Sequence, residues 1–162
     1  MPITSLPRMV LAHDEHFHVV WATAMNVEDV ERWHQDVMGF LAKTTGARAV
    51  VTVLPEGAPP AAPAVRTAVG QSIDKISASG AYSGCIILGR GFQASLQRSV
   101  VAALGLLTNR NDRAMKVAQD GAGFLAKLPP ELRAHADAFH ALLASAEKAA
   151  LPSGGASAGA TA

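Results

Sequence analysis

The chain has a single cysteine, Cys85, which lies within the apolar stretch 85–88. One cysteine cannot form an internal disulfide, and it cannot supply the ligand cluster of a structural zinc site. Aromatic residues make up only 5% of the sequence. A core would therefore consist mainly of Val, Leu, Ile and Ala. Its larger side chains are expected to be Trp21, Trp33, Phe40, Phe92, Phe124 and Phe139.

Charge of either sign and long hydrophobic segments are also scarce. Charged residues make up 17% of the chain and the formal net charge is +1, which excludes a strong field for nucleic acid or an anionic membrane. The longest apolar stretch, residues 100–107, is far too short for a membrane span. Only residues 9–12 are apolar between Arg8 and His13, so no secretory pattern opens the chain. We expect a cytoplasmic protein with no membrane span and no nucleic-acid partner.

Catalytic motifs are missing as well. The sequence contains no G-x-S-x-G elbow, no phosphate-binding loop with its lysine and no H-E-x-x-H helix. Cys85 lies in a predicted strand rather than at a helix start, where a thiol is activated. The expected strands end in Ala24-Met25, Leu54-Pro55 and Leu88-Gly89, without the aspartates of a phosphoacceptor site. We therefore expect a protein that is not an enzyme and holds no cofactor.

The 162 residues suffice for one domain, and 49% of them are hydrophobic. Residues 8–12 and 17–24 are rich in Val, Leu and Trp and flank a polar patch, which predicts a β-hairpin. Asn26 is a predicted N-cap, and the helix that follows ends before Gly46. The apolar positions at helical spacing are Val30, Trp33, Val37, Phe40 and Leu41.

Strands and helices alternate through the rest of the chain. Residues 47–54 predict a strand buried on both faces, Pro63 begins a second helix that ends near Gly80, and residues 82–88 predict another buried strand. A third helix follows the turn at Gly91. Its predicted core face consists of Leu96, Val100, Ala103, Leu104 and Leu107.

A short strand at 114–118, a helix capped by Asp120 and a last helix at 131–150 complete the prediction. This order favours an α/β fold: a single mixed, mostly parallel sheet with an N-terminal hairpin and packed helices. The Pro/Ser/Gly/Ala composition of the C-terminus leaves little to bury. The expected organisation is an N-terminal arm at 1–7, the α/β domain at 8–128, a C-terminal helix at 129–150 and a disordered tail at 151–162.

Residues 89–94, Gly-Arg-Gly-Phe-Gln-Ala, match the G-x-G-x-x-G/A dinucleotide fingerprint after a predicted strand. That fingerprint normally follows the first strand of its fold, whereas about one strand remains here, so the context argues against a dinucleotide. A tight turn that needs glycine dihedrals is the alternative. A less specific hypothesis is a site that binds an anion or an acidic partner. Its predicted residues are Arg90, Gly91, Gln93 and Arg98.

Histidines offer a further hypothesis. His16 and His18 alternate in the predicted hairpin, so their side chains are expected on one face, close to Asp14. His135 and His140 lie in the predicted last helix at a spacing that does not stack them on one face. Neither pair supplies three ligands, so we expect no metal site. An enzyme would need an acid–base pair such as Asp14 with His16 or His18.

The element order resembles the STAS superfamily, the bacterial anti-sigma-factor-antagonist-like fold, and its small stand-alone STAS/SEC14-like members. The resemblance extends from about residue 8 to residue 128, and Phe124 stands where tryptophan is common in the family. It rests on the opening hairpin, Asn-Val-Glu-Asp at 26–29, the strand at 49–54, residues 85–88 before a helix, and the closing segments 115–118 and 122–125.

This resemblance implies a protein that binds a partner protein, or else a small or lipid-like ligand. In phospho-switched members a serine begins the helix after a central strand, but residues 55–65 contain neither Ser nor Thr. We expect a non-enzymatic regulatory module that docks a protein partner without that switch, with ligand binding as the alternative. The C-terminal helix could pair with a second copy, although covering the domain's own sheet is the simpler use of its apolar face.

Overall fold

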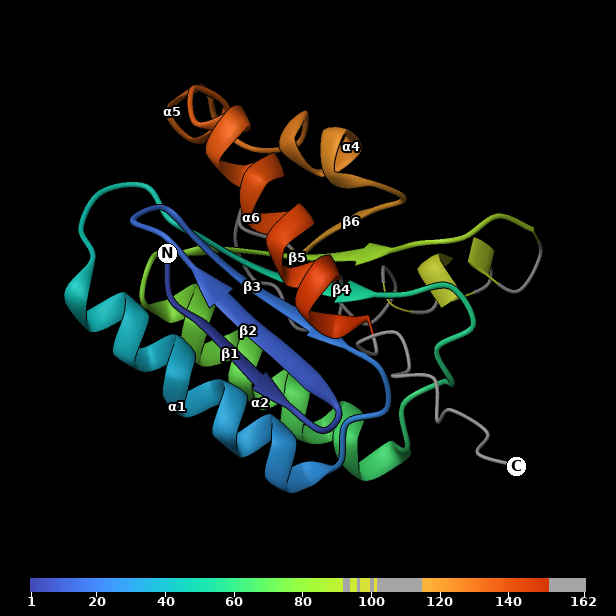
Figure 1. Cartoon of the computed structure of the whole chain (residues 1–162). Coiled ribbons are helices and arrows are strands. Elements are labelled where there is room, and N and C mark those ends of the chain that lie inside the picture. Colours follow the sequence, from blue (N-terminus) through green and yellow to red (C-terminus); the bar gives the residue numbers. More distant parts are fainter. Residues whose placement is uncertain (92–93, 96, 100, 102–114, 152–162) are drawn as a thin grey trace, which may run out of the picture.

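The structure is a computed structural model, and it describes residues 1–91, 94–95, 97–99, 101 and 115–151 (Figure 1). The described strands form one six-stranded sheet in the order β1-β2-β3-β4-β5-β6. The β1–β2 and β2–β3 pairings are antiparallel and the remaining three are parallel. The predicted α/β fold with a mixed sheet is thus confirmed. The strands are β1 (Ile3–Leu6), β2 (Met9–His13), β3 (Phe17–Ala22), β4 (Ala49–Leu54), β5 (Tyr82–Ile87) and β6 (Lys116–Ala118).

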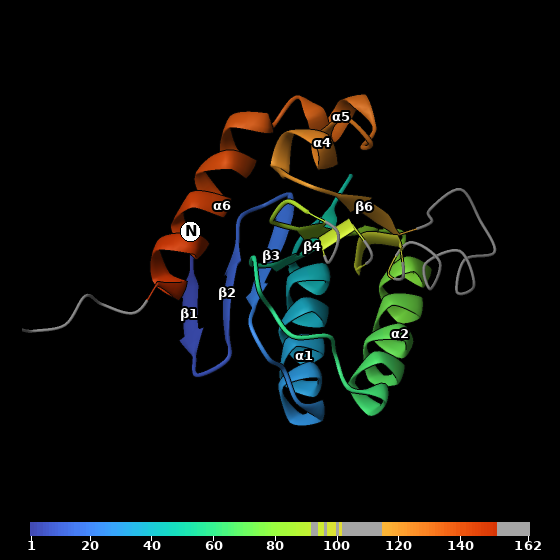
Figure 2. The ribbon, with the colours of Figure 1, turned by 90° about the vertical axis from the view of Figure 1, so that its right-hand side faces the viewer.

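Helices cover both faces of this sheet (Figure 2). Because each parallel strand lies beside the one before it, right-handed crossovers place α1 and α2 on the same face. The shorter C-terminal helices and α6 lie on the opposite face. The helices are α1 (Val27–Lys43), α2 (Pro63–Ala78), α4 (Gly121–Leu125), α5 (Pro130–Arg133) and α6 (Ala136–Ala150).

Alternating side chains divide the core into two halves. On β3, Phe17 and Trp21 pack toward the α6 face, whereas Val20 packs toward the α1 face. All six residues of β3 are buried, as expected for a strand covered on both sides. Trp33 and Phe40 fill the half of the core under α1. This arrangement leaves solvent access mainly at the strand ends and at the sheet edges.

The start of α1 is fixed by the predicted N-cap. Asp29 donates its main-chain N–H to the Asn26 Oδ1 (2.9 Å), and Asn26 donates its main-chain N–H to the Asp29 Oδ2 (2.9 Å), forming a capping box. Arg8, in the β1–β2 turn, donates from Nε to the same Asp29 oxygen at 2.6 Å. The Arg8 hydrogen bond lowers the pKa of the Asp29 carboxyl. One carboxylate therefore ties the first hairpin to the helix.

The other predicted elements also appear close to their expected bounds. The predicted strands at 47–54, 82–88 and 114–118 correspond to β4, β5 and β6. Pro63 begins α2 as expected, and Asp120 caps α4 by accepting the Gly123 N–H at 2.7 Å. The predicted core face of the third helix lies outside the described residues, as does the tail from residue 152 onward.

Two segments differ from the expected organisation. The segment taken as an arm, residues 1–7, contains β1, which pairs with β2 over its whole length. Residues 129–150, expected as one helix, form α5 and α6 because the chain turns at Ala134 and His135. This turn lets Leu132 reach the core as well as the residues of α6.

The apolar face of α6 covers the protein's own sheet. Phe139, Leu142 and Ala146 are buried in the core on the α6 face, and the Phe139 ring lies 4.8 Å from that of Phe17. Of the two uses predicted for this face, the structure shows the simpler one. Within the described residues, no helix is long and apolar enough to cross a membrane.

Close packing between β5 and α4 gives a matched pair of tests. An added Cβ at Gly84 would overlap the Cε2 of the Phe124 ring, whereas one at Gly70, inside α2, meets nothing within 4 Å. Gly84→Ala should lower the free energy of unfolding by about 1–3 kcal/mol through overpacking. Gly70→Ala should raise it by about 0.5–1 kcal/mol through helix propensity. Urea denaturation of both variants measures the difference, and an unchanged Gly84→Ala variant would contradict the packing described.

Candidate functional site

The loops that follow β4 and β5 lie side by side at the carboxyl edge of the parallel strands (Figure 1). They are joined by a hydrogen bond of 3.0 Å that the Gln97 Nε2 donates to the Ala58 carbonyl oxygen. We call residues 55–62 and 88–91 the carboxyl-edge surface. In open α/β sheets this edge is where loops most often bind ligands or partners.

Glycine shapes the second of these loops. Gly89 has a φ of +100°, and an added Cβ there would lie 2.9 Å from the Cγ of Glu56. Gly91 also has a φ of +100°. L-residues with side chains rarely adopt this conformation, so the turn requires both glycines. Backbone geometry and the approach of Glu56 account for the glycine pattern without a bound phosphate.

The predicted partner-site residues have different places in this loop. Arg98 donates from Nη1 to the carbonyl oxygens of Ile87 and Gly89, both at 3.2 Å, and so holds the turn together. Arg90 is exposed, and within the described part of the chain its guanidinium makes no hydrogen bond or ion pair. Gly91 is exposed as well, and Gln93 lies outside the described residues. Arg90 is therefore the positive charge that this surface presents to solvent, beside the exposed carboxylate side chain of Glu56, while Arg98 supports the turn.

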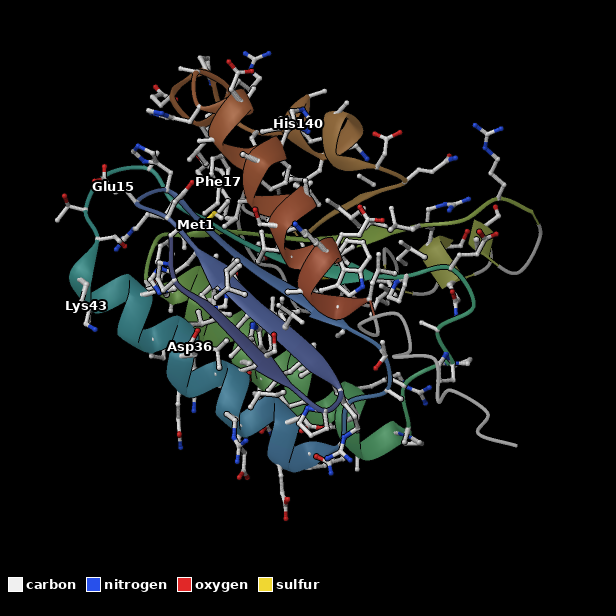
Figure 3. All side chains as sticks on the ribbon, in the orientation of Figure 1. Met1, Glu15, Phe17, Asp36, Lys43 and His140 are labelled. Carbon is white, nitrogen blue, oxygen red and sulfur yellow. The ribbon has the colours of Figure 1, made fainter. Side chains whose placement is uncertain are left out.

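A second polar cluster lies between β2, β3 and α1. The His18 Nε2 is 2.7 Å from the Oδ2 of Asp36, and the rings of His13 and His18 are nearly parallel with centroids 6.0 Å apart. The Phe40 ring lies against both histidines. The His18 side chain is 0% exposed and that of Asp36 is 38% exposed. Asp36, labelled in Figure 3, thus connects a buried imidazole to the surface.

Burial and the hydrogen bond between the two side chains together determine the charge states of His18 and Asp36. Desolvation lowers the pKa of His18 below its ordinary value of 6.5, more than the hydrogen bond to Asp36 raises it. The same hydrogen bond lowers the pKa of Asp36. Near neutral pH, a neutral imidazole therefore donates its Nε2–H to a carboxylate. The His18 Nδ1 is buried and has no hydrogen-bond partner among the described residues, so protonation there is costly.

The acid–base pair that an enzyme would need between Asp14 and His16 or His18 is not formed. Asp14 accepts the main-chain N–H groups of His16 (2.8 Å) and Phe17 (2.7 Å) on one carboxylate oxygen, which closes the β2–β3 loop. β3 begins only at Phe17. The expectation that His16 and His18 share a face is wrong, because this loop removes His16 from the strand alternation. His16 instead stacks on His135, with centroids 3.7 Å apart.

The Cys85 thiol and a metal site are the two remaining candidates. Burial raises the pKa of the Cys85 thiol to about 12, which keeps it protonated at neutral pH. Among the residues that the structure describes, no group of three or more His, Cys, Asp or Glu side chains is arranged to hold a metal ion.

Comparison with models of known protein families finds no match, and comparison with curated proteins finds none either. The STAS-superfamily resemblance remains a prediction from the sequence pattern. Function has to be inferred from the residues of the chain itself.

The His18–Asp36 pair was missed in the sequence, although two signals pointed to it. His18 interrupts a run of strand residues that are otherwise apolar, which marks it as buried. Asp36 lies three residues after Trp33 and four before Phe40, on the flank of the buried face of α1. The spacing of residues along the helix does not predict that this side of α1 faces β3 at the position of His18.

The His18–Asp36 pair predicts that the free energy of unfolding decreases as the pH falls. Since the pKa of His18 is lower in the folded protein than its unfolded value near 6.5, the unfolded chain takes up the proton first as the pH falls. The stabilising contribution is complete above pH 6.5 and is lost below it, by up to about 1.4 kcal/mol per pH unit. His18→Gln should reduce this dependence in urea denaturation between pH 8 and pH 5 (on the order of one titrating group).

His16→Gln is the matched control, because it also removes an imidazole but lies in the adjoining loop, outside the His18–Asp36 contact. Some dependence should persist in His18→Gln, because burial also lowers the pKa of His34. Equal slopes for His18→Gln and the natural sequence would contradict the assignment. The lowered pKa of Asp36 adds a separate loss of stability at more acidic pH, below its ordinary value of 3.8.

Proposed function

We propose that the protein is a non-enzymatic regulatory module that docks an acidic segment of a partner protein on the carboxyl-edge surface. The observation that carries this proposal is Arg90, an exposed guanidinium held out on a turn that Arg98 and two required glycines fix in place. A charge on a preorganised loop loses little freedom on binding. Guanidinium groups also bind carboxylates with two parallel hydrogen bonds.

Several polar side chains that could act in catalysis instead make contacts within the fold, which supports a role in binding rather than catalysis. Asp14 closes a loop, and His18 is completely buried with Asp36. The Cys85 thiol is protonated within the core. These residues serve the fold, which leaves the exposed loops as the part of the described chain best suited to a partner.

The proposal agrees with the STAS-superfamily resemblance, whose known members bind partner proteins. A sheet with strands in chain order and α1 and α2 on one face supports that resemblance. Residues 55–65 contain no Ser or Thr, so the proposed docking does not depend on phosphorylation of the loop after β4. We further propose a bacterial protein, as the resemblance implies, and a cytoplasmic one, which the lone buried thiol supports.

Charge reversal at Arg90 tests the proposal. Affinity capture of the tagged full chain from extract of its native cells should retain a partner protein, and Arg90→Glu should weaken that partner's affinity by on the order of tenfold. Arg133→Glu is the matched control, because Arg133 is also an exposed arginine and lies in α5, away from the carboxyl-edge surface (Figure 1). Calorimetry with the purified partner measures both variants.

A partner that binds Arg90→Glu and the natural sequence equally would place docking elsewhere on the protein. Native mass spectrometry of the captured protein distinguishes docking of a partner protein from the alternative function, the binding of a small ligand. A small additional mass that is lost on denaturation, with no protein partner, would favour a protein that binds a small or lipid-like ligand.

A further inference from the structure

β1 forms an outer edge of the sheet (Figure 2). Among the described residues it pairs only with β2, in the register Ile3↔Ala12 to Leu6↔Met9. A strand at the edge of a sheet carries main-chain N–H and C=O groups that can pair with another chain. Whether this edge can pair with another chain depends on which residues direct their main-chain N–H and C=O groups away from the sheet.

One hydrogen bond identifies the outward-directed residues. His13 donates its main-chain N–H to the Pro2 carbonyl oxygen at 3.3 Å, so Pro2 directs its main-chain groups toward β2. In an antiparallel ladder, successive residues alternate between facing the neighbouring strand and facing away from it. Thr4 and Leu6 therefore also face β2, while Ile3 and Ser5 direct their N–H and C=O groups away from the sheet.

The usual protections of an edge strand do not act on these outward groups. Pro2 lacks an N–H, but that missing donor belongs to the side that faces β2, and Pro7 lies in the turn after β1. Residues 1–7 carry no charged side chain. Lysines, outward prolines and bulges are the features that commonly block such edges. The short length of β1 is the one protection that remains.

Exposed apolar side chains lie at the same edge. Ile3 is 40% exposed and Met1 is 63% exposed. Ile3 is paired with Ala12, a residue of the core on the α6 face, so its side chain lies on that face of the sheet. The apolar face of α6 itself already packs on the protein's own sheet, so that face is not available to a second copy, whereas the β1 edge is exposed.

We propose that two copies of this chain associate by antiparallel pairing of their β1 strands about a twofold axis at Thr4. In this register Ile3 lies opposite Ser5 of the second copy, and the two residues exchange both main-chain hydrogen bonds. Symmetry repeats the exchange on the other side of Thr4. The register is self-complementary, as a twofold interface requires, and uses every outward-directed group of β1.

No charged side chain of β1 would face its own copy across the axis, which favours a second copy over a partner of opposite charge. The α-amino group of Met1 lies before the first residue of β1. The short strand limits the strength of association. We expect a weak dimer whose population rises with protein concentration between about 10 µM and 1 mM.

Amide hydrogen exchange of the full chain tests the pairing directly. Thr4 and Leu6 should be protected at every concentration, because their N–H groups face β2. Ile3 and Ser5 should exchange freely in dilute protein and become protected as the concentration rises. Fast exchange at Ile3 and Ser5 at the highest concentration would overturn the proposal.

Sedimentation equilibrium of charge variants provides a second, independent test. Thr4 is exposed, and across the axis it would lie opposite its own copy, so Thr4→Lys should weaken the dimer by about tenfold or more through repulsion. Thr4→Val keeps the edge uncharged and should retain the dimer. Gln71→Lys adds the same charge on the exposed side of α2 and should have no effect.

A protein that is monomeric at all concentrations would overturn the proposal, as would a dimer that Thr4→Lys does not weaken. The proposed docking at Arg90 is distinguished from this result, because it concerns the carboxyl ends of the parallel strands rather than the β1 edge, and a different partner. Loss of either interaction leaves the test of the other unchanged.

Discussion

Burial of the sheet on both faces is the constraint on which the other features depend. Every residue of β3 is buried, so helices have to cover both sides of it. The capping box of Asn26 and Asp29, joined by Arg8, starts α1 beneath one face, and α6 packs over the other. With both faces covered, the proposed partner site lies at strand ends and the proposed contact with a second copy lies at a sheet edge.

This constraint explains why similar residue types serve different purposes. His18 points into the α1 side of the sheet and needs the Asp36 carboxylate, whereas His16, only two residues away, lies outside the strand and stacks on His135. Arg98 and Arg90 divide in the same way at the carboxyl edge. The first is used to hold the turn, and the second reaches solvent.

Pairing at the edge follows from the same architecture. A sheet with covered faces still has two edges, and hydrogen-bonding groups at an edge are not satisfied by burial of the faces. At β1, the alternation of the main chain rather than side-chain chemistry determines which N–H and C=O groups can pair with another chain. Pro2 is bonded to His13 and so faces β2, and by alternation Ile3 and Ser5 face outward. The proposed partner site and the proposed dimer thus arise at different boundaries of one sheet.

The sequence by itself determined the elements that local periodicity and capping specify. The helix after Asn26, the buried strands, the start of α2 at Pro63 and the Asp120 cap are local signals, and the structure has them all. Only the tertiary structure decided which side chains meet. The His18–Asp36 contact joins β3 to α1, Arg98 binds the carbonyl oxygens of Ile87 and Gly89, and the edge position of β1 depends on the order of the strands in the sheet. Such contacts between elements are not encoded in the spacing of residues along a single element, which determines only the face on which each side chain lies.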